Sequence, residues 1–160
     1  MPDIAAVSQV LARYVRATDR RDGEAVARLF VEDGTIEIRW HNSGTPQPLG
    51  KLRGRQQISM ATAQMILPHP ERGFSHHTTM DHIVTIKDDE AEIDAQFIVY
   101  NTQGAACPET GWPAGAFGVQ GTVTPVGAGY YLSKLIRVDG EWFMREHRID
   151  LDLPMVMGSR

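Results

Sequence analysis

Three of the six histidines of the chain fall within seven positions, in the stretch FSHHTTMDHIVTIKDDEA at residues 74–91. Imidazole groups bind transition metals and act as general bases, which makes this cluster the first candidate for chemistry. In a β-strand successive side chains point to opposite faces, so His76 and His77 would not bind one ion together. His76 and His82 would share a face but lie about 20 Å apart. We therefore expect no metal site, because the chain also contains no HExxH motif and no Cys-His spacing typical of zinc.

A second candidate group lies in RYVRATDRRD, residues 13–22. Tyr14 and Asp19 come near the end of a predicted amphipathic helix, and Asp19 is on the side that leans inward. A carboxylate is costly to bury unless another group pairs with it. Two interpretations stay open: Asp19 caps the turn that leads toward Asp22, or it points into a pocket and orients a histidine that acts as a general base. Each histidine also has the simpler interpretation of a surface residue or a hydrogen-bonded core residue.

Helical periodicity marks the element that would position Tyr14 and Asp19. Apolar residues recur at three- and four-residue spacing over residues 3–19, and Asp3 is the predicted N-cap. The same patterns predict further elements: helices at residues 22–30 and 55–67, a half-buried strand at 35–40 that contains Trp40, and a Gly- and Pro-rich loop at 41–54. The helices would thus come mainly from the first half of the chain.

From residue 74 the pattern changes to that of strands. Strands are predicted at residues 76–87 and 90–101 around an acidic turn. Near the C-terminus, strands at residues 130–138 and 141–151 are predicted to form a hairpin around Asp139-Gly140, a type I′ turn signal. A long loop is expected at residues 103–118. Helices followed by strands favour an α+β fold, in which the helices pack on one face of a curved antiparallel sheet. We predict one domain over residues 1–160.

Composition excludes several classes of function. The net charge is −4 and no run of Lys or Arg offsets it, so we expect neither a nucleic-acid nor an anionic-membrane surface. The single cysteine, Cys107, excludes an internal disulfide framework and a multi-cysteine zinc site. No apolar run reaches the roughly 18 residues of a membrane span, and no signal peptide is visible. We expect a soluble cytoplasmic protein.

Four segments in this order resemble the NTF2-like superfamily, and in particular its SnoaL-like branch. They are RYVRATDRRDGEAVARLFVEDGTIEI, GRQQI, HHTTMDHIVTIKDDEA and GYYLSKLIRVDGEWFMREHRI. The branch includes scytalone dehydratase, the bacterial bile-acid 7α-dehydratase and lindane dehydrochlorinase. The resemblance covers nearly the whole chain and implies a cone-shaped α+β barrel with an apolar pocket in its open mouth.

The resemblance also implies a catalytic dyad of an Asp on the first helix and a His on the first long strand. Asp19 matches the first position. For the second, the family pattern is His followed four residues later by Asn, and His77 with Asp81 fits that spacing with Asp in place of Asn. His76 is kept as the alternative. Tyr14 matches the pocket tyrosine of the bile-acid enzyme.

The first segment resembles ketosteroid isomerase as well, where Tyr14 matches the oxyanion tyrosine. The position of that family's general-base Asp is Ile38 here, which cannot take a proton. The form of isomerase chemistry that depends on this base is therefore not expected.

Four further residues are predicted to contact a substrate: His76, Trp40, Phe117 and Tyr131. Tyr131 matches a tyrosine of the family motif, and Phe117 belongs to a loop that would close over a ligand. The alternatives are a half-buried strand aromatic for Tyr131 and a packed loop aromatic for Phe117. His82 and His147 receive no assigned role.

These residues together predict a lyase without a cofactor, a dehydratase that acts on a small cyclic or aromatic molecule in the barrel pocket. His77 would be the general base, Asp19 would orient it, and Tyr14 would donate a hydrogen bond. Two alternatives remain, a polyketide cyclase or isomerase with the same base, and a non-catalytic ligand-binding or assembly module like the small subunit of a ring-hydroxylating dioxygenase. An exposed sheet face and the resemblance predict a homo-oligomer, a dimer or a trimer.

Overall fold

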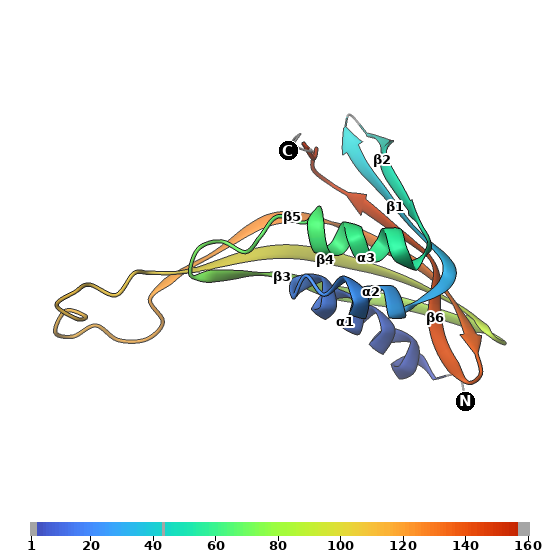
Figure 1. Ribbon diagram of the computed structural model, residues 1–160, viewed down its shortest axis with the longest axis horizontal. Helices are drawn as coiled ribbons and strands as arrows, with labels where there is room; N and C mark the ends of the chain where they lie inside the picture. The colour runs from blue at the N-terminus through green and yellow to red at the C-terminus, as the bar shows by residue number, and fades with distance from the viewer. Residues whose placement is uncertain (1–2, 43, 157–160) are drawn as a thin grey trace.

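The computed structural model describes residues 3–42 and 44–156 (Figure 1). Its three helices are α1 (Ile4–Asp19), α2 (Gly23–Arg28) and α3 (Gly54–Gln64). Asp side chains cap the first two helices: Asp3 accepts from the Ala6 N–H at 2.9 Å, and Asp22 accepts from the Ala25 N–H at 3.0 Å. Each cap satisfies a backbone donor that a helix start leaves without a partner. None of the helices in these residues is long and apolar enough to cross a membrane.

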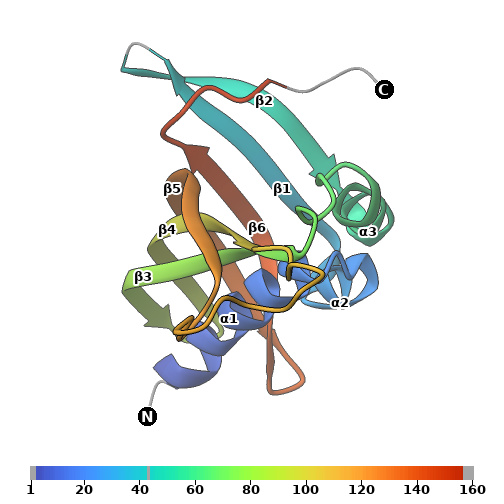
Figure 2. The same cartoon turned by 90° about the vertical axis from the view of Figure 1, so that its left-hand side faces the viewer.

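Six strands form one curved sheet in the order β2-β1-β6-β5-β4-β3. They are β1 (Phe30–Asn42), β2 (Thr45–Arg53), β3 (Gly73–Lys87), β4 (Glu90–Gly104), β5 (Gly121–Val138) and β6 (Glu141–Leu151). The helices lie on one side of the sheet, with α1 across β3 and β4 and with α3 beside β1 and β2 (Figure 2). The predicted α+β fold, helices on a curved sheet, is confirmed, although the sheet does not close into a complete barrel.

One strand pairing differs from the antiparallel pattern expected from the sequence. β1 and β6 run parallel, whereas the other four neighbouring pairs are antiparallel. Strands that follow one another along the chain can join through a tight hairpin and so run antiparallel. β1 and β6 come from opposite ends of the chain, so no hairpin dictates their relative direction.

The prediction of a loop at residues 41–54 is wrong, because Thr45–Arg53 forms β2. Pro46 and Pro48 pair with β1 from this strand, which lies at the edge of the sheet. Proline is tolerated on an edge strand because its missing N–H is not needed by a further neighbour. The composition that suggested a loop therefore marks an edge strand.

A second difference is the length of the ribbon that β4 and β5 form. β5 begins at Gly121, nine residues before the predicted strand at residue 130, and pairs with β4 out to Gly104. The connection between them, residues 105–120, contains neither helix nor strand and projects away from the body (Figure 1). The predicted long loop is therefore present, at the tip of this ribbon.

The core lies between α1 and the concave face of the sheet. The apolar residues there are almost fully buried, and each contributes about 1.5–3 kcal/mol of hydrophobic stabilisation. The central ones are Val7, Leu11, Phe30, Ile93, Phe97, Leu135 and Met144. This packing fixes the end of α1 against β3, the edge strand that carries the histidine cluster.

Candidate active site

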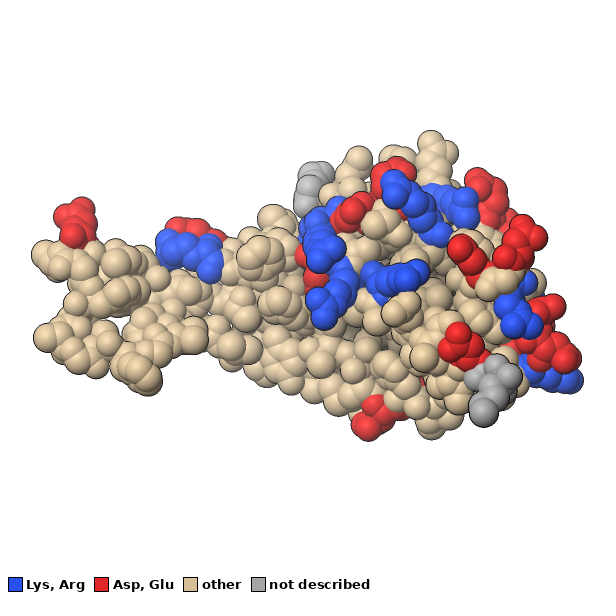
Figure 3. Space-filling model, turned by 90° about the horizontal axis from the view of Figure 1, so that it is seen from below, with Lys and Arg blue, Asp and Glu red and all other residues tan. Residues whose placement is uncertain are grey.

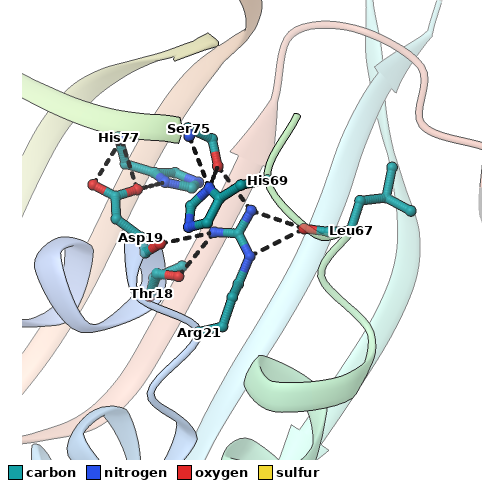
Figure 4. Close-up of polar contacts among 7 residues, drawn as sticks. All are labelled: Thr18, Asp19, Arg21, Leu67, His69, Ser75 and His77. Atoms are coloured by element: carbon teal, nitrogen blue, oxygen red, sulfur yellow. Dashed lines mark hydrogen bonds and ion pairs between the residues drawn. The ribbon is translucent and has the colours of Figure 1, made fainter. Parts of the chain in front are cut away.

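Asp19 and His77 are in direct contact. Asp19 is the last residue of α1, His77 lies on β3, and His77 Nδ1 is 2.6 Å from Asp19 Oδ1 (Figure 4). The His77 main-chain N–H also donates to the carboxylate, at 3.0 Å to Oδ1 and 3.2 Å to Oδ2. Both side chains are mostly buried, 16% and 17% exposed. Of the two interpretations of Asp19, the structure shows the contact with a histidine, while Asp22 caps the next helix.

The geometry of this pair selects one tautomer of the imidazole. A carboxylate only accepts hydrogen bonds, so Nδ1 of His77 carries the hydrogen and donates to Asp19. In the neutral ring, Nε2 is then the nitrogen without a hydrogen and can accept a proton. An imidazole held in this way by a carboxylate has the arrangement of a general base.

Arg21, two residues after Asp19, connects the end of α1 to Leu67 and to Ser75 on β3 (Figure 4). Its Nη1 donates to the carbonyls of Thr18 and Asp19, at 3.0 and 3.3 Å. Its Nε and Nη2 donate to the Leu67 carbonyl, at 3.0 and 2.8 Å, and Nη2 also donates to Ser75 Oγ at 2.7 Å. Burial lowers the pKa of the Arg21 guanidinium, and the nearby Asp19 opposes that shift.

Arg21 has a backbone φ of 59°, in the left-handed region that side chains other than glycine rarely adopt. Such a conformation costs roughly 1–2 kcal/mol for a residue with a Cβ. The hydrogen bonds of its guanidinium offset that cost. Arg21 therefore has a structural role: its hydrogen bonds, called the clamp below, hold the end of α1 against Leu67 and Ser75.

Ser75 is the residue through which Arg21 contacts β3, and it lies two residues before His77 on the same face of the strand. Its main-chain N–H donates to His69 Nδ1 at 3.0 Å, and its hydroxyl accepts from Arg21. Because His69 Nδ1 accepts, the hydrogen of a neutral His69 ring lies on Nε2. Arg21, Ser75 and His69 were not predicted as parts of the site, since nothing in their spacing along the sequence indicates contact.

A groove of about 570 Å³ opens beside the pair, between the outer side of α1 and β3. The α1 side contributes Ala12, Val15, Arg16, Asp19 and Arg20, and β3 contributes residues 74–79. His76 is in this wall but is exposed, on the opposite face of the strand from His77. A larger hollow of about 720 Å³ on the other side of the sheet contains none of the predicted catalytic residues.

Tyr14 and Tyr131 lie in the core behind the pair. Tyr14 packs edge-to-face against Tyr131, with ring centroids 5.9 Å apart, and Tyr131 stacks on Phe97 at 4.2 Å. Burial raises the pKa of both phenols well above the ordinary value, so both keep their protons at neutral pH. Neither ring belongs to the groove wall.

His147 is a further member of this aromatic cluster that the sequence analysis left without a role. It is only 1% exposed, and its ring lies 4.4 Å from Tyr14 and 4.9 Å from Tyr131. Nδ1 is 2.8 Å from Ser133 Oγ, whereas Nε2 is buried without a hydrogen-bond partner among the residues the structure describes. Burial lowers the pKa of His147 to about 3, so the ring is neutral at pH 7. His147 and the apolar Ile149 are two residues apart on β6 and so share a face, which indicates that the His147 side chain points inward.

Two predicted substrate contacts lie apart from the pair. Trp40 is on β1, which β6, β5 and β4 separate from β3. Phe117 is 96% exposed in the projecting loop. His82 belongs to a bulge in which the pairing shifts between Met80 and Ile83.

Asp81, in the same bulge, has a φ of 53°. Asn and Asp adopt this left-handed conformation more readily than most residues. Asp81 therefore suits the backbone conformation of this bulge. Across residues 3–42 and 44–156, no three His, Cys, Asp or Glu side chains are grouped so that they could hold a metal ion.

Comparison with known proteins adds a family model and a set of related folds. A model described as the SnoaL-like domain matches residues 1–148. The β subunit of a proposed aromatic-ring-hydroxylating dioxygenase from Novosphingobium aromaticivorans is similar in structure, with a TM-score of 0.67 at 15% identity, over 95% of this chain and 90% of that chain. No curated protein matches the chain.

Two further structures from Novosphingobium aromaticivorans are similar. An NTF2-like protein with a cystatin-like fold has a TM-score of 0.63 at 18% identity, over 93% of this chain and 81% of its own. A proposed scytalone dehydratase also has a TM-score of 0.63, at 14% identity, over 99% of this chain and 89% of its own. At these identities the likeness shows the fold alone.

Proposed function

The chain belongs to the SnoaL-like domain family, and from this premise and the geometry of Asp19 and His77 we propose that it is a lyase without a cofactor that dehydrates a small cyclic or aromatic molecule. The observation that carries the proposal is the 2.6 Å contact between His77 Nδ1 and Asp19 Oδ1 beside an open groove. The likeness to a proposed scytalone dehydratase supports the type of reaction.

The proposed reaction needs only one base. Nε2 of His77 takes a proton from a carbon activated by a neighbouring carbonyl or ring, and the electrons of that C–H bond form the new carbon–carbon double bond. The C–O bond on the adjacent carbon breaks, and the departing hydroxyl takes the proton from the imidazolium to leave as water. Asp19 keeps the ring in the required tautomer and stabilises the imidazolium in between.

Tyr14 is the proposed hydrogen-bond donor to the oxyanion or to the departing hydroxyl, a role for which it must keep its proton. Burial raises the pKa of Tyr14, so its hydroxyl stays protonated at neutral pH. Tyr14 is buried in the core and is not part of the groove wall, so this role requires that a bound ligand and the phenol come into contact. Tyr14→Phe, which removes only the hydroxyl, separates this role from packing.

A non-catalytic assembly subunit is the second candidate function. The projecting loop favours it, because Phe117 and Val119 are almost completely exposed there. The likeness to a dioxygenase β subunit points the same way. Such a subunit needs no general base, so turnover distinguishes the two.

The test is a panel of cyclic β-hydroxy ketones, both neutral ones and ones that carry a carboxylate or phosphate group, incubated with the protein, with loss of water followed by mass spectrometry. An isomerase acting on the same compounds would give products of unchanged mass, which a changed chromatographic retention time would reveal. For a substrate that is dehydrated, His77→Gln and Asp19→Asn are expected to lower turnover by roughly 10²–10⁴-fold. The double variant should be little worse than the worse single one, because the two residues act as a unit.

His82→Gln is the matched control, since His82 is an exposed histidine of the same strand outside the groove. It should leave turnover unchanged. Full turnover in a folded His77→Gln protein would exclude the mechanism, and no turnover across the panel would favour the assembly function.

A further inference from the structure

The outer side of α1 carries a row of arginines. Arg13 and Arg16 are three residues apart and Arg16 and Arg20 four apart, so they lie on one face of the helix. Figure 3, which views the molecule from below, shows basic side chains on this side of the body, with acidic ones among them. Arg13 donates to Gln9. Within residues 3–42 and 44–156, neither Arg16 nor Arg20 forms an ion pair, whereas Arg55, Arg137, Arg145 and Arg148 each do.

Repulsion between neighbouring arginines of this row opposes the attraction of each cation to the C-terminal end of the α1 dipole. Like charges four residues apart destabilise a helix by about 0.2–0.5 kcal/mol. The chain as a whole has a charge of −4, so the row is a local exception rather than part of a basic protein. An anion between Arg16 and Arg20 would turn this repulsion into attraction, and the guanidinium fork matches carboxylate and phosphate oxygens.

The two arginines belong to the wall of the groove that contains Asp19 and His77. The groove, at about 570 Å³, is in the range of pockets that hold small molecules, about 300–1,000 Å³. Ala12, Val15 and Phe74 supply apolar surface in the same wall. One small groove thus combines two unpaired cations, apolar contacts for a ring, and a histidine in the tautomer of a base.

We propose that Arg16 and Arg20 form an anion-binding subsite, which takes the carboxylate or phosphate group of a substrate. The ring of that substrate lies along Ala12, Val15 and Phe74. The position of its reacting carbon at His77 rests on the proposed function, whereas the binding of the anion does not. The substrate class becomes an anionic cyclic molecule rather than a neutral one.

Three probes of one shape test the subsite: cyclohexanecarboxylate, cyclohexyl phosphate and the neutral cyclohexanecarboxamide. Binding is followed by isothermal titration calorimetry and by chemical shifts of the arginine side chains in NMR. We expect the anions to bind at least tenfold more tightly than the amide, and Arg16→Gln and Arg20→Gln each to weaken anion binding by roughly tenfold, about 1.4 kcal/mol. The ratio of the two anion affinities shows whether the group is a carboxylate or a phosphate.

Arg28→Gln is the control, because Arg28 is an exposed helical arginine outside the groove. It should leave anion binding unchanged. His77→Gln should also bind the anions within about threefold of the unmodified protein, so that failure of the dehydration mechanism does not affect this test. Equal binding of the amide and the anions, no binding of either anion, or unchanged affinity in Arg16→Gln and Arg20→Gln would each overturn the subsite.

Discussion

Replacing Arg21 with methionine tests the clamp that holds Asp19 and His77 together. Methionine keeps most of the aliphatic stem and removes the guanidinium. The two bonds to the Leu67 carbonyl are exposed, and water can replace them. The three bonds to the Thr18 carbonyl, the Asp19 carbonyl and Ser75 Oγ are partly buried, and water replaces them poorly.

At about 1 kcal/mol for each partly buried bond, Arg21→Met should lose about 3 kcal/mol of unfolding free energy. For a domain of this size the melting temperature should fall by roughly 6–12 °C. Arg21→Gly loses the same bonds but is freed from the left-handed strain, so it should recover about 1 kcal/mol of that loss. Urea unfolding monitored by circular dichroism gives these differences.

The clamp also predicts a change at the pair itself. With the anchorage of Ser75 lost, β3 is held less firmly against α1, and the hydrogen bond from His77 Nδ1 to Asp19 should weaken. Nitrogen-15 NMR of the His77 ring reports this as a shift of the Nδ1 and Nε2 signals. Loss of general stability alone would leave those signals unchanged.

Arg28→Met is the control for stability, since the Arg28 side chain is exposed at the end of α2. Surface changes of this kind usually lie within about 0.5 kcal/mol of zero. If Arg21→Met destabilises the protein no more than Arg28→Met, and the His77 signals do not move, the reasoning about the clamp is wrong.

Three further predictions concern the site and the sheet. Asp19→Asn should shift the His77 hydrogen from Nδ1 to Nε2, because an amide can donate to Nδ1; unchanged ring nitrogen shifts in NMR would contradict this. The pKa of His147 is about 3 in the folded protein, against the ordinary 6.5. Between these two pH values the unfolded chain binds one more proton than the folded protein. The free energy of unfolding should therefore fall as the pH is lowered from 6.5 to 3, by about 1.4 kcal/mol per pH unit. His147→Gln should remove one proton from the uptake measured on unfolding in that window, and an identical pH slope would refute the assignment. Gly129→Ala should cost roughly 1–3 kcal/mol, because its Cβ would overlap the Asp150 carbonyl, whereas Gly50→Ala, with open space around it, should cost nothing in the same urea assay.

Local features of the chain could be predicted from the sequence because neighbours within a few residues determine them. The Asp caps of α1 and α2 follow from one side chain and the N–H three residues later. The last hairpin follows from Asp139 and Gly140, whose φ values of 51° and 86° are those a type I′ turn requires. The helices before residue 30 and the strands after residue 74 could be predicted from the spacing of apolar residues alone.

Features that depend on the whole sheet were not predictable in this way. The parallel pairing of β1 with β6 and the edge position of β2 depend on the order of all six strands in the sheet. An edge position also reverses the meaning of Pro46 and Pro48, which in isolation indicate a loop. The same applies to the bulge between Met80 and Ile83, where the pairing of β3 with β4 shifts.

The sequence by itself determined that a tyrosine, a carboxylate and a histidine cluster were present, and its resemblance to a family paired Asp19 with His77. Only the tertiary structure decided the surroundings of that pair, because residues 58 positions apart meet only when α1 packs on β3. It placed Tyr14 in the core, left Phe117 exposed, buried His147, and attached Arg21 to Ser75. Burial and distant contacts result from packing summed over the whole chain, and no short window of residues contains that sum.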